Sequence, residues 1–143
     1  MTTYLAGLDG SEASTRAASY AAEQAKHTGA ALILAHAIEW SGFDVMGVEE
    51  LADRHNIRDA EIEHAEQEIL KPVLTLLSDQ VGDVQSIIHH GHPAKTLLAL
   101  INERKVDHVY VGRHGSTRLA IAIVGSTTNS IIQASPVPVT VVP

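Results

Sequence analysis

Short apolar runs alternate with segments of helical periodicity along this chain. Five runs rich in aliphatic and β-branched residues have the length of buried strands, and Gly, Asp or Pro stands at most of their ends. These runs are Tyr4–Leu8, Ala31–Ala37, Val84–Ile88, His108–Val111 and Val137–Val142. Strands that alternate with helices predict β-α-β units, and therefore an α/β fold with one open parallel sheet and helices on both faces.

The segments between these runs supply the predicted helices, which cover Ala13–Lys26, Ile57–Leu77, Ala94–Glu103 and Ser126–Gln133. Ser11 is suited to cap the first helix, and Pro93 to stand in the first turn of the third. Pro72 lies inside the second pattern and is expected to kink or divide that helix. The segment 38–53 fits neither periodicity and is interpreted as a long, mobile loop.

Composition narrows the class of protein. The 143 residues suit a single domain, 1–143, and only five of them are Phe, Tyr or Trp, so small aliphatic side chains must build the core. A net charge of −7 disfavours a nucleic-acid surface, which requires a basic face. The chain has no Cys, no apolar stretch long enough to span a membrane and no recognisable targeting signal. We therefore expect a cytoplasmic protein without a membrane partner.

One segment carries candidate chemistry: Gly112-Arg113-His114-Gly115, followed nine residues later by Gly125-Ser126-Thr127. It leaves a predicted strand and opens a helix. Gly112 is expected to turn the chain off the strand by adopting a positive φ, and Gly115 to let a ligand approach the backbone. The free N–H groups at the helix start favour an anion, and the hydroxyls of Ser126 and Thr127 can add hydrogen bonds to phosphate.

This spacing, Gly-x2-Gly-x9-Gly-Ser, resembles the ATP-binding signature of universal stress proteins. The resemblance extends over the chain, through 7–14 as a first strand and turn, Gly91-His92-Pro93 after the third strand, and 136–142 as the last strand. It implies a Rossmann-like sheet of five parallel strands in the order 3-2-1-4-5. Gly7 stands where many members have Pro, which weakens the comparison on the adenine side.

The resemblance also implies a nucleotide site. Asp9 would contact the ribose or adenine end, and the backbone near Ala37 would meet adenine. The phosphates would lie on the glycine-bearing turn, for which the candidate residues are Gly112, Arg113, His114, Gly115, Gly125, Ser126 and Thr127. The expected ligand is ATP or another adenine nucleotide with Mg²⁺ or Mn²⁺ on its phosphates, since clustered phosphate charge needs neutralising. Family members commonly dimerise through the last strand, so Val139–Val142 is the expected homodimer edge.

Three functions stay open. A nucleotide-dependent regulatory or stress-response role is favoured, because the chain has neither the lysine-bearing phosphate loop nor the second carboxylate motif of efficient NTPases. A weak ATPase or phosphotransferase using His114 or Asp9 is the second hypothesis. A dimeric interaction module that needs no nucleotide is the third.

Several of these residues also have structural interpretations. Asp9 suits a helix-capping turn beside Gly10, and both roles are compatible in one carboxylate. The histidines 89, 90 and 92 suit solvated loop positions better than a metal site, because neighbours on a strand point to opposite faces. For Arg113 and Arg118, phosphate contact and simple solvation are equally favoured. For Trp40 and Phe43, a partner surface or pocket lid is favoured no more than packing under the loop.

Overall fold

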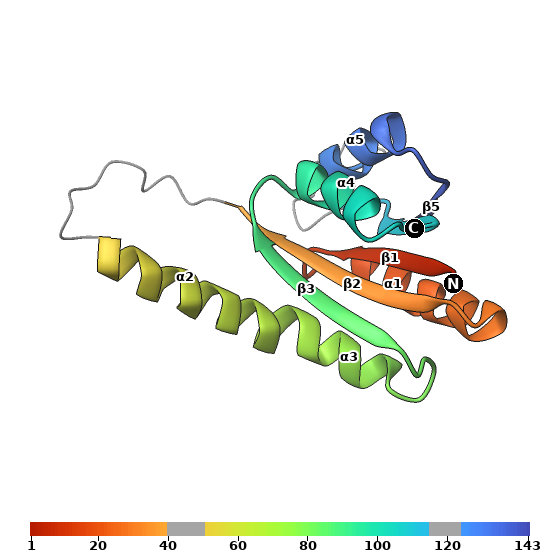
Figure 1. Cartoon of the computed structure of the whole chain (residues 1–143), viewed down its shortest axis with the longest axis horizontal. Helices are drawn as coiled ribbons and strands as arrows, with labels where there is room; N and C mark the ends of the chain where they lie inside the picture. The colour runs from red at the N-terminus through yellow and green to blue at the C-terminus, as the bar shows by residue number, and fades with distance from the viewer. Residues whose placement is uncertain (40–50, 115–123) are drawn as a thin grey trace.

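The computed structural model describes residues 1–39, 51–114 and 124–143, with the side chains of 51–54 excepted. Its centre is a five-stranded sheet in the order β3-β2-β1-β4-β5, and every neighbouring pair is parallel (Figure 1). The strands are β1 (Thr3–Leu8), β2 (Ala31–Ile38), β3 (Val84–His90), β4 (His108–Gly112) and β5 (Val139–Val142). The predicted strand order is confirmed.

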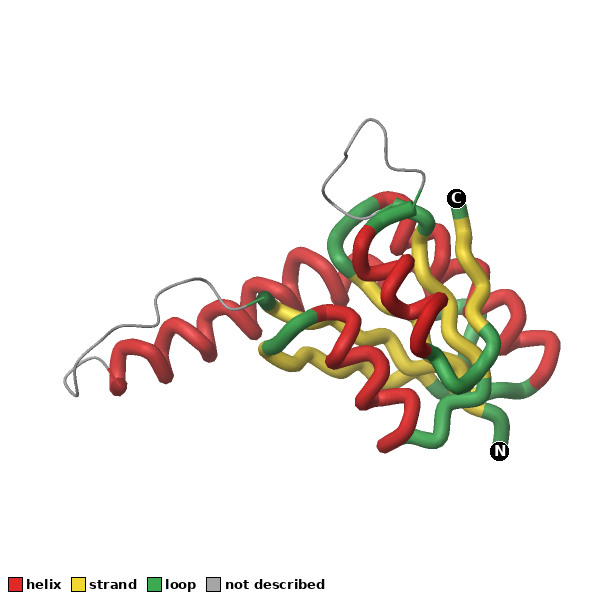
Figure 2. Tube along the Cα trace, turned by 90° about the horizontal axis from the view of Figure 1, so that it is seen from above, coloured by secondary structure: helices red, strands yellow, loops and turns green. Residues whose placement is uncertain are grey.

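Helical segments cover both faces of the sheet, as predicted (Figures 1 and 2). They are α1 (Glu12–Thr28), α2 (Leu51–Ala65), the π-helical turn η2 (Glu66–Leu70), α3 (Lys71–Leu77), α4 (Pro93–Glu103) and α5 (Ser126–Ala134). Alternate strand residues point to opposite faces, so two cores form. Leu5, Ile33 and Val109 pack with α4 and α5, whereas Ala6, Leu32 and Leu34 pack with α1 and α3.

The buried side of helix α1 is built almost entirely from Ala. Ser11 caps it by accepting from the Ser14 N–H at 3.2 Å, and Gly29 ends it in the left-handed conformation with φ of 76°. The buried residues of the helix are Ala13, Ser14, Ala17, Ala18, Ala21, Ala22 and Ala25. Small side chains on this face let the start of α1 reach the end of β4.

The second predicted helix, which was expected to kink or divide at its internal proline, instead continues without a break as the contiguous segments α2, η2 and α3. A proline ring clashes with the carbonyl four residues earlier, which is that of Glu68 here. The chain accommodates Pro72 through the π-helical turn η2, in which the Lys71 N–H donates to the Glu66 carbonyl five residues back. The helix continues into α3 beyond this turn (Figure 1).

The expected long loop over 38–53 is corrected at both ends. Ile38 is the last residue of β2, where it pairs with His90, and residues 51–53 belong to α2. Residues 40–50, with Trp40 and Phe43, lie outside the described residues. Among the helices of the described ranges, none has the length and hydropathy to cross a membrane.

Candidate functional site

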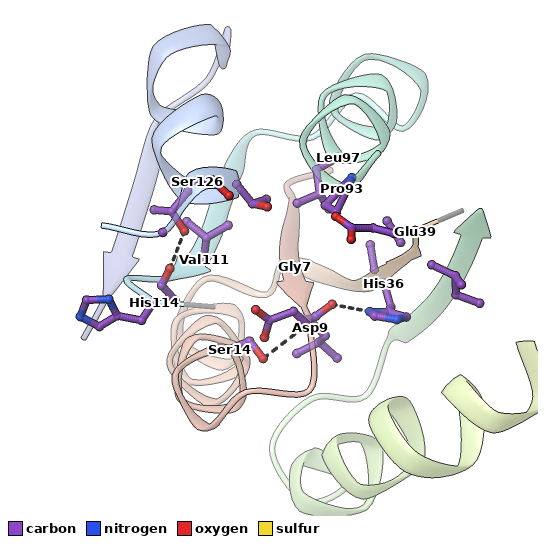
Figure 3. Close-up of a pocket in the computed structure, with 18 residues that line it drawn as sticks. Gly7, Asp9, Ser14, His36, Glu39, Pro93, Leu97, Val111, His114 and Ser126 are labelled. Atoms are coloured by element: carbon purple, nitrogen blue, oxygen red, sulfur yellow. Dashed lines mark hydrogen bonds between the residues drawn. The ribbon is translucent and has the colours of Figure 1, made fainter. Parts of the chain in front are cut away.

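A cavity of about 370 Å³ opens at the carboxyl ends of β1, β2 and β4 (Figure 3). This is the edge at which open α/β sheets bind ligands, and the volume falls in the range of small-molecule sites, roughly 300–1,000 Å³. Its floor is the turn after β1 and the ends of β2 and β4, and its sides come from α4 and the start of α5. Three helices, α1, α4 and α5, begin beside it.

The turn after β1 is held by its own side chains. The Ser11 N–H donates to Asp9 Oδ1 at 2.9 Å, and the Ser11 hydroxyl donates to the same oxygen. The Asp9 N–H in turn donates to Ser14 Oγ at 3.3 Å, and Gly10 supplies the positive φ of 85° that closes the turn. Asp9 therefore has the turn role foreseen for it, and it lines the cavity as well.

The β4 side shows a different use of glycine. Gly112 does not have the positive φ that was expected of it, so that prediction is wrong. A Cβ at this position would instead lie 2.8 Å from the carbonyl carbon of Ala13 and 2.9 Å from the Ser14 nitrogen. Gly112 is needed because the end of β4 touches the backbone of α1. Its carbonyl accepts a 2.6 Å hydrogen bond from the buried Thr128 hydroxyl, which ties β4 to α5.

Helix α5 begins at the cavity without a side-chain cap. Its N-cap residue is Gly125, in extended conformation with φ of −64° and ψ of 157°, and the Gly125 N–H donates to the Arg113 carbonyl at 2.8 Å. The first intrahelical bond runs from the Asn129 N–H to the Gly125 carbonyl. The N–H groups of Ser126 and Thr127 precede that bond and stand beside the cavity, together with the positive end of the helix dipole.

Seven of the predicted site residues line the cavity: Asp9, Ala37, Gly112, His114, Gly125, Ser126 and Thr127. Arg113 is exposed and does not line it, and Gly115 and Arg118 lie outside the described residues. The ring of His114 is directed away from Asp9 and His36 (Figure 3).

Sequence reasoning missed other lining residues, among them His36 and Glu39 at the end of β2 and Pro93 and Leu97 on α4. His36 Nδ1 lies 2.7 Å from the Leu8 carbonyl and donates to it across the β1–β2 pair. Nothing in the local sequence marks this contact, since it depends on the strand register that places His36 opposite Leu8.

Carboxylates are the charged groups of the described cavity wall, namely Asp9 and Glu39. No group of three metal-ligating side chains occurs within the described ranges. His89 and His90 are strand residues, which corrects the loop interpretation. His90 is partly buried, and its Nε2 lies 2.9 Å from Glu61 Oε2 on α2.

The perturbed titrating groups, Tyr110 and His108, lie on β4 and do not line the cavity. Tyr110 is buried between Tyr4 and Tyr20, and burial, with smaller contributions from both phenols, raises its pKa to about 12. His108 stacks on Tyr110 with ring centroids 4.6 Å apart and shares a 2.7 Å hydrogen bond with Thr140. Desolvation lowers the pKa of His108 from its ordinary value.

Comparison with known proteins places this geometry in context. The model of the universal stress protein family matches residues 1–143. A universal stress protein of Mycobacterium bovis is 30% identical over 139 residues, which are 96% of this chain and 44% of that protein. The chain thus spans less than half the length of the curated relatives it matches.

Solved structures resemble the whole chain. Universal stress protein UspA from Lactobacillus plantarum has a TM-score of 0.84 at 21% identity, covering 99% of this chain and 97% of its own. A universal stress protein in complex with cAMP has a TM-score of 0.69 at 25% identity, covering 99% of this chain and 97% of its own. An Archaeoglobus fulgidus member in complex with dAMP has a TM-score of 0.70 at 16% identity, with 100% and 98% covered, which speaks to fold alone.

Proposed function

We propose that this chain, which belongs to the universal stress protein family, binds an adenine nucleotide in the cavity and that occupancy governs its conformation or choice of partner. The phosphates lie on the first turn of α5, at Gly125, Ser126 and Thr127. The ribose and adenine extend past Asp9 toward the end of β2 at Ala37. The observation that carries the proposal is the uncapped start of α5 beside this cavity.

The three helix starts at the cavity differ in what their N–H groups already bind. The first turn of α1 uses Ser11 as its acceptor, and that of α4 uses His92 Nδ1, which accepts from the Lys95 N–H at 3.4 Å. At α5 the N-cap is a glycine, which has no side chain to offer. An anion in the cavity would therefore find its best donors at α5, where phosphate oxygens complement both the N–H groups and the dipole.

The cAMP complex supports an adenine nucleotide as the ligand class, because that protein shares this fold over nearly its whole length. In this chain, the end of β2 and the apolar residues Pro93 and Leu97 of α4 form the wall opposite the α5 turn. A cavity with hydrogen-bond donors at one side and apolar surface at the other suits a phosphate joined to a purine.

A divalent ion would enter with the nucleotide. Mg²⁺ is usually held by substrate phosphates, water and one or two carboxylates, which does not require a prebuilt protein cage. The hydroxyls of Ser126 and Thr127 at the start of α5 fit this mode, since they line the cavity beside the proposed phosphate position. The ion would neutralise the phosphate charge there.

Strand β5 is the basis for a homodimer in this proposal. It is an edge strand whose residues Val139–Val142 are each only partly buried, and it pairs with β4 on one side. A second copy of the chain that adds its own β5 would satisfy this edge. Light scattering across a concentration series, with Val141→Lys to disrupt the edge, tests for dimers.

Turnover is the second candidate, by a slow ATPase or phosphotransferase using His114 or Asp9. The contacts favour binding, because Ser11 already donates twice to Asp9 Oδ1 and the His114 ring is directed away from Asp9. A single-turnover assay with ATP and Mg²⁺ separates the two. Fast phosphate release that is lost in His114→Ala or Asp9→Ala would establish an enzyme.

The direct test of binding starts from the purified protein. The protein is denatured, and the supernatant is analysed by mass spectrometry for adenine nucleotides. Separately, protein freed of bound nucleotide is titrated calorimetrically with ATP plus MgCl₂, with AMP and with cyclic AMP. We expect saturable binding of at least one of them. A protein that carries no nucleotide and binds none of the three is instead a nucleotide-independent interaction module.

A further inference from the structure

We propose that His36 is a positioning residue for the nucleotide site, a role that rests on the proposed function and adds a residue to it. His36 is the last residue of β2 that is in register with β1, opposite Leu8. The chain leaves the sheet directly after Leu8, and the next residue is Asp9 (Figure 3). A bond at this pair therefore sets where the Asp9 turn starts.

The bond itself is short and its direction is fixed by chemistry. His36 Nδ1 lies 2.7 Å from the Leu8 carbonyl oxygen. A carbonyl can only accept, so Nδ1 carries the proton, in the neutral ring as well as in the charged one. The contact therefore fixes the Nδ1–H tautomer of the neutral ring.

Hydrogen bonds with Ser11 and Ser14 hold Asp9 at the start of α1. His36 adds a restraint from β2, where the next residue is Ala37, on the adenine side of the proposed site. It thus fixes the spacing between the two groups proposed to meet the nucleoside. The start of α5, which is proposed to bind the phosphates, has no contact with this bond among the described hydrogen bonds.

The two amide variants of His36 give a stereochemical test. An Asn side chain carries its amide nitrogen on Cγ, as the imidazole carries Nδ1, whereas the Gln nitrogen stands one atom further out. His36→Leu removes the donor altogether. We expect Kd for AMP and for ATP plus MgCl₂ to rise by the same factor, about tenfold, in His36→Leu. The Asp9 turn would lose the bond that positions it, which should cost about one hydrogen bond to the nucleoside while the phosphate contacts stay. Both Kd values of His36→Asn are expected to lie within about threefold of those of the unchanged protein, whereas those of His36→Gln are expected to stay raised.

A histidine elsewhere in the sheet is the matched control. His108 is also half-buried and hydrogen-bonded to its neighbour Thr140, but it pairs with Tyr4 at the far end of β1. His108→Leu is expected to lower the unfolding temperature without changing either Kd. A nitrogen-15 spectrum of the histidine rings should show the neutral imidazole of His36 as the Nδ1–H tautomer.

The outcomes separate the two levels of the proposal. If the unchanged protein binds neither AMP nor ATP, the proposed function fails. If it binds and folded His36→Leu binds equally well, His36 has no positioning role and the site assignment survives. Should His36→Leu not fold, the comparison of His36→Asn with His36→Gln decides, and equal affinities in those two variants would overturn the inference.

Discussion

Helices α1 and α5 both begin at the cavity, each after a strand and a glycine-bearing segment, yet their first turns are built in opposite ways. At α1, Ser11 and Ser14 accept or donate within the turn, and Asp9 is drawn into the same network. At α5, the N-cap is Gly125, which has no side chain to bond to the first N–H groups. The start of α1 is capped by its own N-cap side chain, whereas the start of α5 has no such cap, and we propose that a ligand binds there.

This comparison teaches that the glycines of one motif serve different purposes. Gly112 belongs to the structural side, because its missing side chain makes room for α1. Gly125 provides no side-chain cap at the start of α5, where we propose that phosphate binds. The contacts thus assign Gly112 a packing role and leave Gly125 as the proposed ligand residue of the same motif.

The largest expected effect is on folding, from Gly112→Val. The new Cβ would press on backbone atoms of Ala13 and Ser14, which cannot rotate away, so the free energy of unfolding should fall by about 3 kcal/mol. Gly82→Val is the matched control, since no atom lies within 4 Å of a Cβ there. Chemical denaturation measures both, and equal stability of the two variants would contradict the packing role.

Gly125→Val should act on binding instead. The φ and ψ at this position are those of extended backbone that any residue adopts, so the fold should persist. The isopropyl group would occupy the space proposed for phosphate, and the loss of about two hydrogen bonds to a charged group should raise Kd for ATP about 100-fold. Calorimetry measures this Kd. If Gly125→Val bound ATP with unchanged affinity, the phosphates would have to lie elsewhere.

Ser11→Ala tests the closed helix start. Removal of an N-cap hydroxyl should lower the free energy of unfolding by about 1 kcal/mol. The same substitution at Ser126, which follows the N-cap residue of α5, should change stability by less than about 0.5 kcal/mol. Thermal unfolding compares the two variants, and equal losses would mean that the helix starts do not differ as described.

The smallest expected effect concerns pH and the end of the sheet away from the cavity. The pKa of His108 is lower in the folded state than its ordinary 6.5, so the unfolded state takes up a proton first as pH falls. The His108 contribution to stability should be constant above pH 6.5 and decline as pH drops below it. Urea denaturation at pH 7.5 and 5.5 should show a smaller decline in His108→Asn than in the unchanged protein, and an identical decline would rule out this contribution.

Much of the fold was predictable from sequence because the strands are continuous apolar runs and the helices have clear starts at Ser11 and Pro93. The strand order and the position of Asp9 at the cavity followed from the family resemblance, and the positions of Gly125 and Ser126 followed from the motif. The reason for Gly112, the π-helical turn before Pro72 and the bond from His36 to Leu8 could not be predicted. Those features depend on backbone geometry and on contacts between segments far apart in sequence, which periodicity does not report.

The central claim, that the start of α5 is open for an anion, is tested most directly by Ser126→Asp. A carboxylate in the first turn interacts favourably with the helix dipole, so unfolding should be unchanged or occur at a slightly higher temperature. The same charge should repel phosphate, so Kd for ATP plus MgCl₂ measured by calorimetry should rise at least about tenfold. Opposite changes in stability and affinity are the predicted result, and a stable Ser126→Asp protein that binds ATP as tightly as the unchanged chain would contradict the account.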